Sequence, residues 1–163
     1  MSNLKDKPDA YVGYVLKRTQ AALRNGLDDA LRPLGLTAPQ YTCLRLLRHD
    51  QGISNSELAR GAFVTRQSMN AVVKGLQERG LITRPEFATS GRELPTTLTD
   101  EGTLAVEKGD AAADALEAVM TAGLTAADIG RLTELLHGCA ERLEAAQAPG
   151  EPRASHVSRY NPP

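Results

Sequence analysis

The chain has 163 residues, which is the size of one domain and too short for separate cofactor and substrate domains. Apolar residues make up 41% and charged residues 24%, and no apolar run reaches the roughly 20 residues that a membrane-spanning helix needs. Residues 1–92 hold 14 Lys and Arg against 8 Asp and Glu, whereas residues 93–163 hold 5 against 12, so the net charge of −1 conceals a basic half and an acidic half. This asymmetry indicates either a polyanion-binding surface or ordinary solvated helix faces, and we favour the first.

No cofactor, metal or catalytic constellation is evident in the sequence. Cys43 and Cys139 lie far apart in apolar helical patterns, which favours inert core thiols over a disulfide or a metal site. The histidines are scattered, and there is no glycine-rich phosphate loop, nucleophile elbow or carboxylate cluster. The first eight residues hold no hydrophobic segment, so no secretory signal is expected. We therefore expect a cytoplasmic protein that is not an enzyme and uses neither cofactor nor metal.

The first two helices are predicted from apolar spacing and capping signals. Residues 8–34 form one long predicted helix, because apolar residues recur at steps of three, four or seven, and Gly35 ends it. A second helix begins at the capping box Thr37-Ala-Pro-Gln40 and ends near Gly52. The apolar stripe of the first helix consists of Val12, Leu16, Leu23, Leu27, Leu31 and Leu34.

Two more capped helices follow in close succession. Ser54 and Glu57 form a second capping box, which opens a helix of about two turns that Gly61 ends. Thr65 can cap the next helix, which Gly80 closes. The spacing predicts that the inward face of that helix consists of Met69, Val72, Val73 and Leu76.

A β-hairpin is predicted after the fourth helix. Residues 81–85 and 94–98 are strand-like runs, and residues 86–93 form the tip that joins them. Pro95 lacks a backbone N–H, so the second strand should be an edge strand or be interrupted there.

The remaining chain is predicted to be helical up to about residue 147. One helix follows Thr99, with Asp100 and Glu101 where a helix N-terminus favours negative charge. Another begins at Thr125-Ala-Ala-Asp128, which resembles a capping box. Its apolar stripe is Ile129, Leu132, Leu136, Cys139 and Leu143, and residues 148–163 are predicted to be extended or disordered.

This order of elements is that of a winged helix-turn-helix, a mainly α fold with a small β-hairpin wing. The long N- and C-terminal helices carry more apolar surface than the short elements can cover, which predicts dimerisation. We divide the chain into an N-terminal dimerisation helix at 1–34, a winged helix-turn-helix DNA-binding domain at 35–99, C-terminal dimerisation helices at 100–147 and a tail at 148–163.

The fourth helix carries polar groups suited to reading DNA. Arg66, Asn70 and Lys74 follow one another every four residues on the outward face, with Gln67 nearby. Arg pairs with guanine, Asn and Gln pair with adenine, and Lys binds guanine or phosphate. Alternatively, such residues are the ordinary surface of a solvated helix, but residues 60–92 have a local charge of +4. The candidate DNA-binding residues are Ser54, Thr65, Arg66, Gln67, Ser68, Asn70, Lys74, Arg84 and, at the wing tip, Arg92.

Five motifs in order resemble the multiple antibiotic resistance regulator (MarR) family of winged-helix transcription factors, over roughly residues 8–147. The resemblance implies a homodimer whose first, fifth and sixth helices interlock and which binds pseudo-palindromic double-stranded DNA. It also implies release of the DNA by a small, frequently aromatic or anionic ligand. The motifs are Leu36-Thr-Ala-Pro-Gln-Tyr41, Ser56-Glu-Leu-Ala59, Val64-Thr-Arg66, Leu76-Gln-Glu-Arg-Gly-Leu-Ile82 and Leu98-Thr-Asp-Glu-Gly102.

Three positions depart from the family pattern. Ser90 stands where the wing usually has an aspartate, Ala71 where the recognition helix often has an arginine, and Pro95 interrupts the second strand. The alternative function is therefore a winged-helix interaction module that has lost sequence-specific DNA binding. The outward polar residues of the fourth helix argue for a DNA-binding transcriptional regulator, expected to be a repressor associated with the nucleoid.

Two groups of residues are candidates for a ligand site. Tyr11, Tyr14 and Arg18 share one face of the first helix, and Tyr41 and Arg45 are four apart on the second. Aromatic rings with a guanidinium suit an aromatic carboxylate, and the family resemblance places ligands between such helices and the DNA-binding lobe. The alternative is that the tyrosines pack at the dimer contact and the arginines are solvated.

Overall fold

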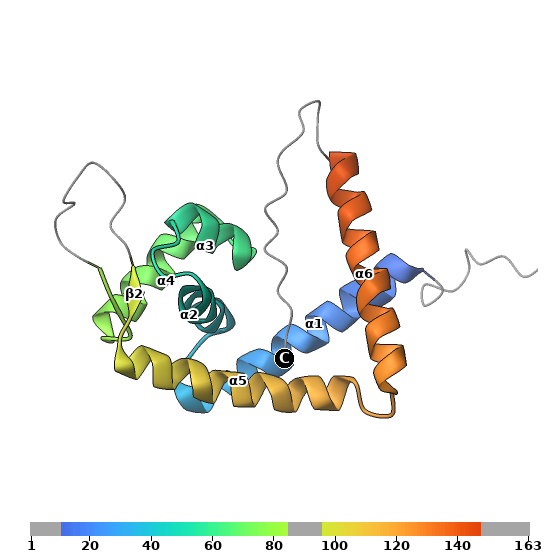
Figure 1. Ribbon diagram of the computed structural model, residues 1–163, viewed down its shortest axis with the longest axis horizontal. Helices are drawn as coiled ribbons and strands as arrows, with labels where there is room; N and C mark the ends of the chain where they lie inside the picture. The colour runs from blue at the N-terminus through green and yellow to red at the C-terminus, as the bar shows by residue number, and fades with distance from the viewer. Residues whose placement is uncertain (1–10, 85–95, 148–163) are drawn as a thin grey trace, which may run out of the picture. The chain divides into compact units, whose positions relative to one another are not determined.

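The computed structural model describes residues 11–84 and 96–147. The chain forms two compact units, residues 1–120 and 121–163. Helices α1 to α5 and the two-stranded sheet belong to the first unit, and α6 belongs to the second (Figure 1). The predicted mainly α fold with a small hairpin is confirmed. Within the described ranges, no helix is both long and apolar enough to cross a membrane.

The first predicted helix is shorter than expected and has two parts. Helix α1 spans Val12–Leu31, and a single 3-10 turn, η3, spans Arg32–Leu34. Pro33 explains the change, because it has no N–H to continue the α-helical hydrogen bonds. Gly35 then ends the segment with a left-handed φ of 64°, as predicted.

Helices α2 (Ala38–His49), α3 (Asn55–Gly61) and α4 (Arg66–Glu78) begin at the predicted caps. The capping boxes of Thr37 and Ser54 are both complete, and the Thr65 side chain accepts a hydrogen bond from the Ser68 N–H. Helix α2 lies at the centre of the first unit, in contact with α1, α3, α4 and α5. The core around it includes the fully buried Leu31, Leu44, Leu47, Leu58, Met69, Leu76 and Val106.

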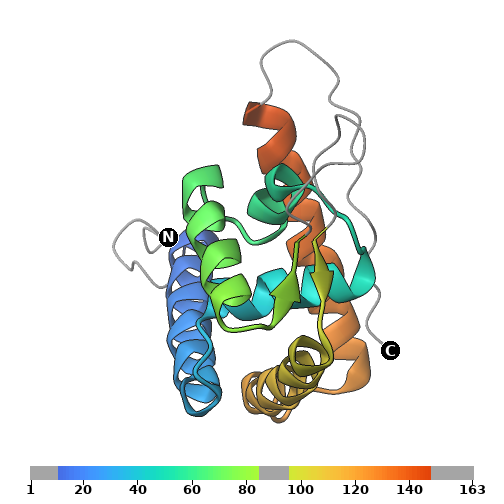
Figure 2. The ribbon, with the colours of Figure 1, turned by 90° about the vertical axis from the view of Figure 1, so that its left-hand side faces the viewer.

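The wing is shorter in its described part than the sequence predicts. Strand β1 (Ile82–Thr83) pairs antiparallel with β2 (Thr97–Leu98), so that Ile82 faces Leu98 (Figure 2). The Thr83 and Thr97 hydroxyls lie 3.0 Å apart across the pair. The tip at 86–93, with Ser90 and Arg92, lies outside the described residues, as does Pro95 of the predicted second strand.

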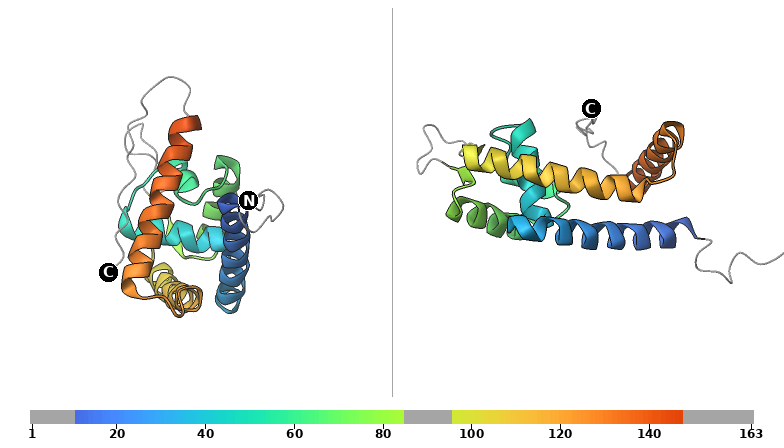
Figure 3. Two further views of the ribbon diagram at one scale, coloured as in Figure 1. Left: turned by 90° about the vertical axis from the view of Figure 1, so that its right-hand side faces the viewer. Right: turned by 90° about the horizontal axis from the view of Figure 1, so that it is seen from below.

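Helix α5 (Asp100–Met120) runs antiparallel to α1 and beside it (Figure 3). Two glycines let α5 approach the rest of the unit closely. A Cβ at Gly109 would lie 2.5 Å from the Tyr41 ring, and a Cβ at Gly102 would lie 1.9 Å from the Leu81 carbonyl oxygen. The start of α5 is therefore held directly against the segment that leads into the wing.

In the described part of the second unit, the helix is α6 (Ala126–Gln147), which begins at the predicted capping box. The Thr125 hydroxyl donates to Asp128 at 2.6 Å, and this bond lowers the pKa of the Asp128 carboxyl. No residue of α6 is buried, and Leu132, Leu136 and Leu143 of the predicted stripe are exposed. The tail at 148–163 lies outside the described residues, and the functional division of the chain stays a prediction.

Candidate nucleic-acid interface

Helix α4 has one buried face and one polar exposed face. Met69, Val73 and Leu76 are buried, which confirms most of the predicted inward face, and Val72 is half-buried. The outward residues Arg66, Gln67, Asn70, Ala71 and Lys74 are all exposed. Burial of the apolar face fixes the rotation of α4 about its axis, so the predicted polar residues necessarily face outward together.

The N-terminus of α4 carries hydroxyl groups beside the backbone N–H groups that a helix cannot pair within itself. The Thr65 Oγ1 atom accepts from the Ser68 N–H at 3.1 Å and lies 2.8 Å from the Ser68 Oγ. The cap satisfies only one of the N–H groups at this helix end, and the remaining N–H groups of the first turn point outward along the axis. This end of α4 can accept a phosphate oxygen.

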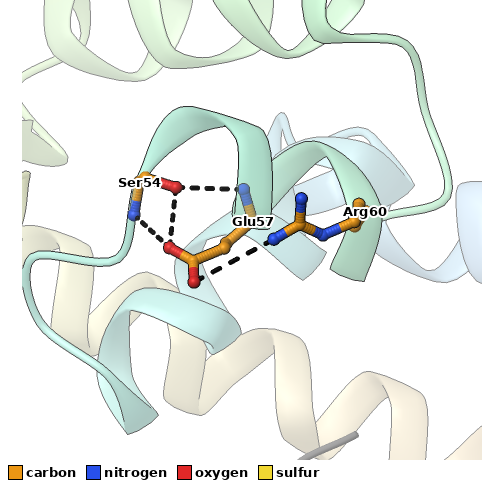
Figure 4. Close-up of polar contacts among 3 residues, drawn as sticks. All are labelled: Ser54, Glu57 and Arg60. Atoms are coloured by element: carbon orange, nitrogen blue, oxygen red, sulfur yellow. Dashed lines mark hydrogen bonds and ion pairs between the residues drawn. The ribbon is translucent and has the colours of Figure 1, made fainter. Parts of the chain in front are cut away.

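The Ser54 side chain is engaged within α3 (Figure 4). Its hydroxyl donates to Glu57 Oε2 at 2.6 Å, and the Ser54 N–H donates to the same oxygen at 3.0 Å. These bonds lower the pKa of the Glu57 carboxyl, with a smaller effect from Arg60, whose Nη2 lies 4.0 Å from Oε1. A phosphate contact by Ser54 therefore has to share its hydroxyl with the capping box.

Two contacts at the outward face of α4 involve residues that the sequence analysis missed. Asn55, the first residue of α3, donates from Nδ2 to the Asn70 Oδ1 at 2.5 Å. Lys74 forms an ion pair with Glu78 one turn later, at 3.8 Å. The spacing of four identifies the second contact in the sequence, but residues 55 and 70 belong to different helices, and no local pattern joins them.

Arginines near the wing divide between structural and candidate DNA-binding roles. Arg79 donates from Nη1 to the Gly35 carbonyl at 2.7 Å, so it ties the end of α4 to the turn after η3. Arg84 is half-buried, and its Nε has no hydrogen-bond partner among the residues that the structure describes. Arg92 lies outside them.

Two of the predicted ligand residues meet at a partly buried polar cluster between α2 and α5. Tyr41 is 2% exposed, its hydroxyl donates to Asp110 Oδ1 at 2.7 Å, and the Arg45 guanidinium lies 5.5 Å from the centre of its ring. Arg48 binds Asp110 at 2.5 Å and Arg45 approaches it at 3.5 Å. Burial, followed by the bond to Asp110, raises the pKa of Tyr41. The sequence analysis missed Arg48 and Asp110, since Asp110 comes from a distant helix.

The other predicted ligand residues lie toward the start of α1. Tyr11 immediately precedes the helix, and its carbonyl accepts from the Tyr14 N–H. The two tyrosines are 50% and 47% exposed, and Arg18 is exposed as well. A separate open groove of about 550 Å³ lies near the end of α1 and the start of α2. It is lined by Arg24, Asp28, Arg32, Gly35, Leu36, Thr37 and Pro39.

The fold and the exposed polar face of α4 define a winged helix-turn-helix protein of the kind that binds DNA. The chain belongs to the MarR family, whose family model matches residues 34–93. The HTH-type transcriptional repressor Rv2887 of Mycobacterium tuberculosis is 46% identical over 118 residues, which is 72% of this chain and 85% of that protein.

Solved structures of this relative have the same fold. Rv2887 in complex with salicylic acid aligns with a TM-score of 0.67 at 41% identity, covering 79% of this chain and 96% of that chain. Rv2887 in complex with DNA aligns with a TM-score of 0.67 at 39% identity, covering 79% of this chain and 97% of that chain. The family resemblance found in the sequence motifs is therefore confirmed.

Proposed function

We propose that this protein is a transcriptional repressor that binds pseudo-palindromic operator DNA as a homodimer, with α4 in the major groove. The observation that carries the proposal is the outward polar face of α4, held by the burial of Met69, Val73 and Leu76 on the opposite face and by a capped N-terminus. The relative Rv2887 is named a transcriptional repressor and was crystallised with DNA. Such a protein acts in the cytoplasm, on the nucleoid.

The exposed residues of α4 divide into base-reading and phosphate-binding groups. Arg66, Gln67 and Asn70 carry the donor and acceptor groups that distinguish bases in the major groove. Thr65 and Ser68 stand at the helix N-terminus, where hydroxyls and backbone N–H groups favour phosphate. The remaining candidates bind the backbone or the minor groove, namely Ser54, Lys74, Arg84 and Arg92.

Homodimer formation is supported by apolar surface that the two units leave exposed. Val12, Leu16 and Leu23 of α1 and Val119 of α5 are exposed in the first unit. Helix α6 exposes Leu132, Leu135, Leu136 and Leu143. Exposed apolar stripes of this length are typical of protein interfaces. A twofold dimer would place its two α4 helices in major grooves about 34 Å apart.

A small aromatic acid is the proposed effector. Rv2887 was crystallised with salicylic acid, and Tyr41 and Arg45 offer a ring and a guanidinium in this chain. Asp110 already pairs with Arg45 and Arg48, so an incoming carboxylate has to compete with it for these arginines. Tyr11, Tyr14 and Arg18 form the second candidate site. The effector releases DNA only if it binds the DNA-free conformation more tightly.

Selection of duplexes on the purified protein, followed by anisotropy titrations at several salt concentrations, tests the proposal. We expect a pseudo-palindrome bound more than about 10³-fold tighter than unrelated duplexes. Arg66→Ala should weaken binding to that site by about 1 to 3 kcal/mol. Arg32→Ala is the matched control, since Arg32 is exposed and paired with Asp29 away from α4. Weak binding that is equal for all duplexes and disappears with salt would instead favour the protein-interaction module.

A further inference from the structure

The side-chain amide of Asn70 is held from behind by a second amide. Asn70 lies in the middle of the outward face of α4, and Asn55 at the start of α3 donates to its Oδ1 at 2.5 Å. Asn55 is half-buried, and its own Oδ1 is buried without a hydrogen-bond partner in the described part of the chain. The oxygen of Asn70 therefore faces α3, and its nitrogen is the polar atom left for a ligand.

The orientation of the two amides follows from the burial of the Asn55 Oδ1 atom. If both amides turned over, the buried position would hold an NH₂ group with two unpaired donors in place of one carbonyl oxygen. Buried N–H groups without partners are rarer in proteins than under-satisfied carbonyl oxygens. The arrangement with Nδ2 of Asn55 as the donor is thus the one that the packing of α3 favours.

This orientation determines which bases Asn70 can recognise. A bidentate contact to adenine needs the Asn oxygen to accept from N6 while the nitrogen donates to N7. Guanine presents two acceptors, O6 and N7, to the same groove, and cytosine presents only a donor. An amide that offers its nitrogen matches guanine best and cytosine worst.

We propose that Asn55 is a specificity-determining positioning residue, which orients the Asn70 amide as a donor and thereby directs α4 toward guanine at one position of each half-site. This inference rests on the proposed DNA-binding function. It differs from the adenine preference that the sequence alone suggests for an asparagine, because the contact with α3 occupies the acceptor side of the amide.

The substitution Asn55→Asp tests the orientation directly. A carboxylate has only acceptors, so it requires Asn70 to turn its Nδ2 inward and present Oδ1 to the groove. An acidic residue in the first turn of α3 is compatible with the helix. The added charge lowers affinity for every duplex, and Ser56→Asp provides the control, because it adds the same charge one residue away and leaves the contact between residues 55 and 70 intact.

The readout is the base selected at each position of the operator by wild type, Asn55→Asp, Asn55→Ala, Asn70→Ala and Ser56→Asp. Wild type and Ser56→Asp should prefer guanine at one position by about 5- to 150-fold, the range of one bidentate contact. Asn70→Ala and Asn55→Ala should lose that preference, and Asn55→Asp should replace guanine by adenine or cytosine at the same position.

Retention of guanine by Asn55→Asp or by Asn55→Ala overturns the inference, because the amide orientation then does not depend on Asn55. The two alanine variants decide the matter even where the aspartate variant fails to fold. Failure of the proposed function has a different signature: wild type itself then selects no sequence. If wild type selects a palindrome and all variants select the same one, DNA binding stands and this inference alone fails.

Discussion

Replacing Asp110 with asparagine removes the carboxylate that joins α5 to α2. This carboxylate accepts from the Tyr41 hydroxyl at 2.7 Å and pairs with Arg48 at 2.5 Å and Arg45 at 3.5 Å. The side chains of Asp110, Arg45 and Arg48 are 24%, 28% and 34% exposed. Breaking a fully buried ion pair costs about 3 to 5 kcal/mol, and exposed pairs contribute about 0 to 1 kcal/mol. For these partly exposed groups we expect Asp110→Asn to lower the free energy of unfolding by about 2 kcal/mol.

Urea denaturation at pH 7, followed by circular dichroism at equal protomer concentrations, measures this loss, since dimer stability depends on concentration. The matched control is Asp114→Asn, which removes the same charge from an exposed position one turn later in α5 and should change stability by less than about 0.5 kcal/mol. Tyr41→Phe should cost about 1 kcal/mol, and the double variant with Asp110→Asn less than the sum. Equal effects of Asp110→Asn and Asp114→Asn would refute the argument that the cluster fastens α5 to α2.

Three further predictions concern the packing and the chemistry of the first unit. Gly102→Ala should lower the free energy of unfolding by about 2 to 3 kcal/mol, because the new Cβ would lie 1.9 Å from the Leu81 carbonyl oxygen. Gly75→Ala is the control, since the nearest atom to its Cβ would be 3.6 Å away. This variant should stabilise α4 by up to about 1 kcal/mol in the same urea assay. Phe63 is 95% exposed and has a φ of 53°, in the left-handed region that favours glycine. Phe63→Gly should therefore raise the melting temperature, and Phe63→Ala should leave it nearly unchanged. Equal melting temperatures for the two variants would exclude backbone strain at this position. Burial raises the pKa of the Cys43 thiol to about 12, so its stabilising contribution is complete below pH 9 and is lost as pH rises toward that value. Between pH 8.5 and 10.5, the free energy of unfolding should therefore fall more for wild type than for Cys43→Ala, by up to about 1.4 kcal/mol per pH unit above pH 9. Parallel curves of unfolding free energy against pH for the two proteins would contradict this.

Sequence alone determines the features whose interactions are local. The caps at Thr37, Ser54, Thr65 and Thr125 are all present, because each joins a side chain to groups three residues away. The two faces of α4 follow from its apolar period, since the buried residues recur at helical spacing and leave the polar ones outward. The family motifs of the winged helix are of the same local kind.

Tertiary structure decided the contacts between residues that are distant in the chain. Pairing of Tyr41 with Asp110 spans 69 residues, and the bond between Asn55 and Asn70 spans 15 and joins two helices. Neither pair has a sequence pattern, because the partners meet only after α2, α3, α4 and α5 pack together. Helical periodicity places Asn70 on the outward face, but the direction in which its amide points depends on its neighbour in α3. The sequence alone thus determines which face of α4 is polar. The packed fold determines whether Asn70 on that face presents a hydrogen-bond donor or an acceptor.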